Sequence, residues 1–92
     1  MRIGRVTELF DLSGRGVVVV LETPISQLPS GLTLRIGDPI EFRDGDTVML
    51  ESRVAGIEHC DPSTARTLFA FLLPRGVTQD SVAIGSDVWT VA

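Results

Sequence analysis

The side chains best suited to catalysis or metal binding are those of His59, Cys60 and Asp61, which are consecutive in the sequence. A cysteine beside a histidine could form a thiolate nucleophile, and both residue types bind metals. Adjacent residues on a strand point to opposite faces, however, so this pair cannot readily share a hydrogen bond. The chain has one cysteine and one histidine, whereas a zinc site needs three or four ligands. We therefore expect a strand end or a loop here, without a catalytic or metal-binding role.

Two glycine-containing motifs have both a chemical and a structural interpretation. Asp44-Gly45-Asp46 resembles the start of a calcium loop but lacks the downstream Gly and Glu, and Asp-Gly is a strong hairpin signal. Gly14-Arg15-Gly16 could bind an anion through backbone N–H groups with help from Arg15. The interpretation we favour is a tight turn that needs glycine geometry and leaves Arg15 solvated.

Length and charge restrict the function further. The 92 residues suit a single domain, residues 1–92, and the net charge is −4. All eight basic residues are arginine, so a Walker-type phosphate loop, a Schiff base and a Ser–Lys pair are excluded. The acidic balance disfavours general nucleic-acid binding. Because the N-terminus lacks an apolar signal and Val17–Leu21 is too short to span a membrane, we expect a cytoplasmic protein without cofactor or nucleotide site.

Turn signals separate short runs of β-forming residues along the whole chain. We expect strands at 2–10, 17–22, 40–43, 48–54 with a continuation through Ile57, 66–73 and 88–91, and a long loop at 24–35. Such spacing is typical of an all-β fold, here a small closed antiparallel β-barrel of six to seven strands.

Alternation within these strands predicts which side chains face the core. In the third strand, Glu41 and Arg43 face solvent. Arginines alternate with carboxylates along the strands, as in Glu41/Arg43 and Glu51/Arg53, and we expect cross-strand ion pairs on this solvated face. A bulge or bend at Gly56 would keep the preceding and following apolar residues inward. The side chains predicted to face inward are Val6, Phe10, Ile40, Phe42, Val48, Leu50, Val54 and Ile57.

Five motifs occur in an order that resembles a known family. They are Gly14-Arg15-Gly16, Leu34-x-Ile36-Gly37-Asp38, Val54-x-x-Ile57-Glu58, Leu72-Leu73-Pro74-Arg75-Gly76-Val77 and Asp80-x-Val82-x-Ile84-Gly85-x-Asp87-Val88. This order resembles the second domain of elongation factor Tu, the β-barrel shared by translational GTPases, over about residues 3–91. The resemblance implies a stand-alone barrel of that type, without the GTPase domain.

The resemblance also bears on RNA binding. In elongation factor Tu this barrel helps to hold the aminoacyl end of tRNA, through a Glu and a nearby Arg. Glu58 matches that Glu, but Asp61 stands about where the Arg would be. A carboxylate does not replace a guanidinium beside a phosphodiester or carbonyl oxygen.

The apolar content points to more hydrophobic surface than one small barrel can bury. Val17–Leu21 and Leu68–Leu73 are apolar on both strand faces, and the 24–35 loop or a partner could cover the outer face. We therefore expect a non-enzymatic protein-interaction or self-association module, such as a homodimer; the alternative is an accessory of translation that binds tRNA or ribosomal RNA through Arg15, Arg66 and Arg75. The candidate interaction residues are Arg15, Leu28, Leu32, Glu58, Arg66, Phe69 and Arg75.

Overall fold

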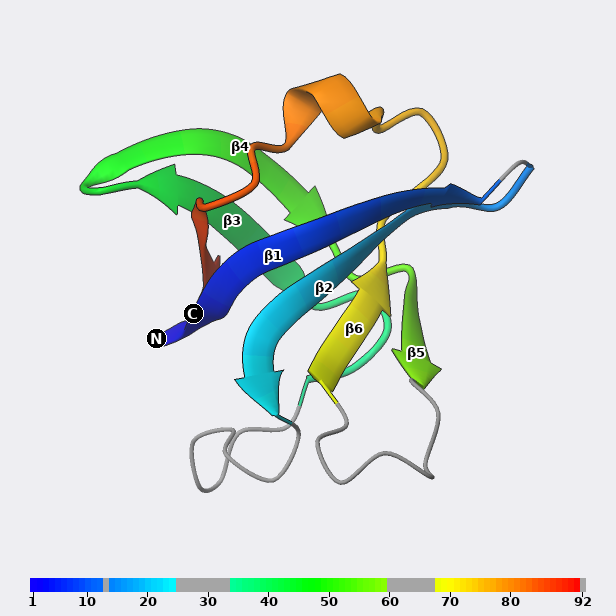
Figure 1. Cartoon of the computed structure of the whole chain (residues 1–92), viewed down its shortest axis with the longest axis horizontal. Helices are drawn as coiled ribbons and strands as arrows, with labels where there is room; N and C mark the ends of the chain where they lie inside the picture. Colours follow the sequence, from blue (N-terminus) through cyan, green and yellow to red (C-terminus); the bar gives the residue numbers. More distant parts are fainter. Residues whose placement is uncertain (13, 25–33, 60–67, 92) are drawn as a thin grey trace.

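Seven strands account for most of the structure. The computed structural model describes residues 1–12, 14–24, 34–59 and 68–91. Its elements are β1 (Arg2–Leu12), β2 (Gly16–Pro24), β3 (Pro39–Asp44), β4 (Thr47–Arg53), β5 (Gly56–His59), β6 (Leu68–Leu72), a 3-10 turn η2 (Gln79–Ser81) and β7 (Asp87–Thr90) (Figure 1). The predicted all-β class is thereby confirmed. Within these ranges no helix has the length and apolar character needed to cross a membrane.

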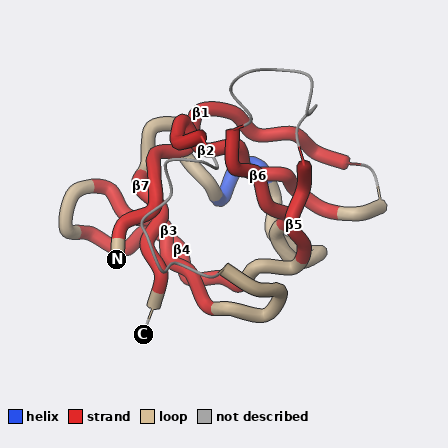
Figure 2. Tube along the Cα trace, turned by 90° about the horizontal axis from the view of Figure 1, so that it is seen from below, coloured by secondary structure: helices blue, strands red, loops and turns tan. Residues whose placement is uncertain are grey.

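The strands form one sheet in the order β4-β3-β7-β1-β2-β6-β5, and every neighbouring pair is antiparallel. The two end strands, β4 and β5, are nevertheless consecutive in the chain, separated by Val54 and Ala55 alone. The Val54 N–H donates to Asp38 O (3.0 Å), and the Ala55 N–H donates to Leu72 O (2.8 Å). The sheet therefore curls until its two ends approach each other (Figure 2). No ladder joins β4 to β5 in the described ranges, so strand pairing does not close the sheet there.

The inner face of the curled sheet holds the main hydrophobic core. Phe71 lies at its centre with no exposed surface, and its ring centroid lies 6.4 Å from that of Phe42 and 6.0 Å from that of Phe69. Ile40 and Phe42 are buried there as predicted. The other buried members are Ile3, Val6, Val17, Val19, Leu21, Val54, Leu73, Val82 and Val88.

The prediction for the β4–β5 segment is correct for three of its four apolar residues. Leu50, Val54 and Ile57 pack in or against the core, but the prediction for Val48 is wrong, because its surface is 42% exposed. A bulge explains this difference. Phe42 pairs with Leu50 and Arg43 with Val48, so Met49 is an extra residue on β4 and the strand changes face there.

Candidate functional site

A second apolar cluster lies on the outer face of the sheet. Val18 and Val20 on β2 and Ala70 on β6 form it, with Leu12, Leu68 and Leu72 packed against them. These are the alternate residues of strands whose other side chains fill the core, as the two-faced apolar pattern predicts. Val18, Val20 and Ala70 are at most 7% exposed, so the chain itself already covers the centre of this outer cluster.

Phe10 extends the outer face onto β1. It pairs with Val18, which lies on the outer face, and half of its surface is exposed. Its prediction as a core residue is therefore wrong. Val6 pairs with Leu21 and Glu8 with Val20, so a bulge at Thr7 reverses the alternation between Val6 and Phe10. One feature of the sequence indicates this bulge. Strict alternation that buried Val6 and Phe10 would also have buried the charged Glu8.

Arg15 and Glu58, both candidate residues, are joined by an ion pair. Arg15 lies in the turn between β1 and β2, and its Nη2 lies 2.9 Å from Oε1 of Glu58 on β5. The sheet order places β2 and β6 between them. The arginine side chain therefore connects the hairpin turn with the end strand of the sheet, and its charge is already partnered.

The remaining candidate residues do not lie together with this pair. Phe69 was predicted to contribute to an interaction surface, but it belongs to the core and is only 6% exposed. Arg75 is exposed in the turn after β6. Leu28, Leu32 and Arg66 lie outside the described residues, as do Cys60 and Asp61. In the described ranges no three potential metal ligands come together.

Both glycine motifs form turns. β3 ends at Asp44 and β4 begins at Thr47, with Gly45 at a φ of 59°, which confirms the Asp-Gly hairpin. In the other turn, the Arg15 N–H donates to Leu12 O at 2.8 Å while its guanidinium contacts Glu58. These contacts support the tight-turn interpretation of Gly14-Arg15-Gly16, since neither group is left to hold an anion.

A cavity of about 360 Å³ opens beside the same turn. Its walls come from the β1–β2 hairpin and from the turn after β6, where Arg75 is one of the candidate residues. The lining residues are Asp11, Leu12, Gly14, Gly16, Val17, Arg75, Gly76, Val77 and Thr78. Its size is at the lower end of the range for small-molecule pockets.

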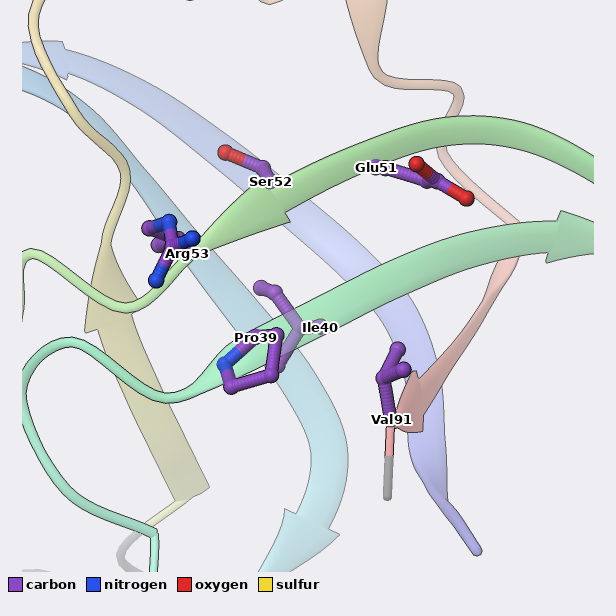
Figure 3. A pocket seen from close by; sticks show the side chains of 6 residues that line it. All are labelled: Pro39, Ile40, Glu51, Ser52, Arg53 and Val91. Carbon is purple, nitrogen blue, oxygen red and sulfur yellow. The ribbon is translucent and has the colours of Figure 1, made fainter.

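A second cavity of about 300 Å³ lies where β3, β4 and the chain after β7 meet (Figure 3). Its charged residues are Glu51 and Arg53, but Nη1 of Arg53 donates to Gly37 O at 3.3 Å. Within the described ranges neither Glu51 nor Arg53 has an oppositely charged group within ion-pair distance, so neither forms the cross-strand ion pair predicted for such alternating residues.

A polar cluster lies on the outer face of β3 and β7. The sequence predicted the outward positions of Glu41 and Arg43 but not the contribution of Trp89. Arg43 donates from Nε to Oε1 of Glu41 at 2.6 Å, so this ion pair forms within β3 and is not one of the predicted cross-strand pairs. The Arg43 guanidinium also lies over the Trp89 ring, 4.2 Å from the ring centroid. Glu41 is only 7% exposed rather than solvated, because Arg43 and Trp89 lie on the same face as its carboxylate.

Comparisons with models of protein families, with curated proteins and with solved structures find no match to this chain.

Proposed function

We propose that this chain is a non-catalytic β-barrel of the translation-factor type that acts as a self-association or protein-interaction module. The interaction surface is the outer face of β1, β2 and β6. One observation carries this proposal: Phe10 is half exposed beside an apolar cluster that the chain covers only partly at Leu12, Leu68 and Leu72.

The physical reason is the free energy of burying apolar surface. When a partner covers an exposed phenylalanine ring and the aliphatic side chains beside it, the complex is stabilised by about 25 cal/mol for each Å² of apolar surface removed from water. Aromatic residues on such patches are common anchors of protein interfaces. The acidic Glu8 and the Arg15–Glu58 pair would provide a polar rim.

The translation-factor part of the proposal rests on topology and motif order. The end strands β4 and β5 follow each other across two residues, which suits a sheet curled into a barrel. The order of the five motifs described above, from the Gly14 turn to Asp87-Val88, resembles that of the second domain of elongation factor Tu.

RNA binding is the second candidate, and the structure offers it less support. Arg15 is engaged by Glu58, which lowers its availability for a phosphate. Arg75 remains exposed. A complex with total tRNA at about 50 mM salt that weakens steeply as salt rises would favour this function over protein binding.

Sedimentation of the wild type, Phe10→Asp and Met49→Asp across a wide concentration range tests the main proposal. Met49 is a matched control, because it is an exposed apolar residue near the β3–β4 hairpin, away from the β1–β2 hairpin (Figure 1). We expect concentration-dependent association of the wild type and Met49→Asp, and a monomer for Phe10→Asp.

The same two variants would also identify a partner protein that binds through Phe10. It should be captured by the wild type and by Met49→Asp but not by Phe10→Asp. A wild type that stays monomeric and captures nothing that depends on Phe10 would overturn the proposal.

A further inference from the structure

The cavity beside the β1–β2 hairpin is a candidate site for a small ligand. One wall is the hairpin, with Asp11 and Val17 paired across it on the same face. The opposite wall is the turn that contains Arg75 and Val77. Asp11 belongs to the face opposite that of Phe10. Leu12 lines this cavity and also packs against the outer cluster, so the cavity adjoins the proposed interaction surface at Leu12.

Glycine backbone shapes the walls of this cavity. Gly14 and Gly76 have φ angles of 80° and 96°, and a Cβ at either position would meet no atom within 4 Å. The space beside both residues is therefore open. Backbone polar groups in such turns are accessible to a small ligand.

Two opposite charges line the cavity without forming an ion pair with each other. Asp11 and Arg75 are both exposed, and neither is among the residues of the ion pairs or side-chain hydrogen bonds formed within the described ranges. The other cavity differs on this point, because Arg53 already donates to a backbone carbonyl there.

We propose that this cavity binds a small zwitterion with an apolar group between or beside its charges. Its carboxylate would pair with Arg75, its ammonium group with Asp11, and its apolar part would contact Leu12, Val17 and Val77. A ligand with a single charge is less suitable. A simple anion would be repelled by Asp11, and a simple cation by Arg75.

Nuclear magnetic resonance titration of the ¹⁵N-labelled chain tests this proposal with three matched probes. L-leucine carries both charges, leucinamide only the ammonium group, and 4-methylpentanoate only the carboxylate. We expect L-leucine to shift the amide signals of Gly14, Gly76 and Val77 with millimolar affinity, since both charged partners lie at an exposed rim. The two single-charge probes should bind about fivefold more weakly or more.

Variants assign the two charges. Arg75→Gln and Asp11→Asn should each weaken L-leucine binding about fivefold, whereas Arg53→Gln in the other cavity should leave it unchanged. Their amide spectra away from the cavity show whether each variant folds as the wild type does. The proposal is overturned if L-leucine shifts none of the three signals, if leucinamide or 4-methylpentanoate binds equally well, or if Arg75→Gln and Asp11→Asn bind like the wild type.

Discussion

Nη2 of Arg15 lies 2.9 Å from Oε1 of Glu58, although the sheet order places two strands between the hairpin turn and β5. The pair links residues 43 positions apart in the chain. Arg15 is well exposed, with 60% of its side chain accessible, so water weakens the attraction. The pair nevertheless connects the turn with β5, the strand at one end of the sheet.

We expect the Arg15–Glu58 pair to contribute only about 0.2–1 kcal/mol to the free energy of unfolding. Urea unfolding of Arg15→Gln, Glu58→Gln and the double variant would give the coupling energy. The coupling should fall as salt is raised, because exposed ion pairs are screened. A coupling energy well above this range, or one insensitive to salt, would show that the two side chains are more buried than their exposed fractions of 60% and 29% indicate.

Two phenylalanines provide a matched test of the inner and outer faces. Phe71 is fully buried between Phe42 and Phe69, so Phe71→Ala should lower the unfolding free energy by about 3–5 kcal/mol. Phe10→Ala should cost less than about 1 kcal/mol, because the ring is half exposed. Thermal or urea unfolding measures both. If Phe71→Ala does not fold, Phe71→Leu supplies the comparison, and equal losses at the two positions would contradict the assignment of faces.

Alanine substitutions at Gly16 and Gly14 distinguish two causes of destabilisation, an unfavourable backbone conformation and a lack of space for a side chain. Both have positive φ, at 125° and 80°, which an alanine adopts at a cost of about 1–2 kcal/mol. A Cβ at Gly16 would also lie 2.8 Å from the Leu73 carbonyl oxygen, whereas a Cβ at Gly14 would meet nothing. Gly16→Ala should therefore lower the melting temperature more than Gly14→Ala. The reverse order would mean that β6 does not approach this turn so closely.

Removal of Arg43 should destabilise the chain more than neutralisation of Glu41. Arg43→Met leaves a carboxylate of 7% exposure without its cation and removes the contact with Trp89, so a loss of about 2–4 kcal/mol is expected. Glu41→Gln keeps a hydrogen-bond acceptor for Arg43 and should cost less. Urea unfolding compares the two.

Fluorescence gives an independent readout of the same contact. Trp89 is the single tryptophan of the chain, and the Arg43 guanidinium lies over its ring. Acrylamide should quench its emission more strongly in Arg43→Met than in the wild type. Arg53→Met is the control and should leave quenching unchanged; equal quenching in all three proteins would exclude the contact.

The candidate site was predictable only where it depends on local pattern. The uninterrupted apolar run Val17–Leu21 predicted a strand with two apolar faces, and the structure shows both. The pairing of Arg15 with Glu58 could not be read from the chain, because it depends on which strands become neighbours. Nor could the cavity between Asp11 and Arg75, which are 64 positions apart in the sequence (75 − 11).

The amino-acid sequence by itself determined the all-β class, the glycine turns and most inward-facing residues, because period-two alternation and turn chemistry are local properties. It predicted the change of phase between Val54 and Ile57 but not the other two interruptions of the alternation. The bulges at Thr7 and Met49 turned Phe10 and Val48 outward, and such extra residues are accommodated only when neighbouring strands set the register. The tertiary structure alone decided that Phe10 and Val48 remain at the surface, since their burial depends on contacts between distant strands.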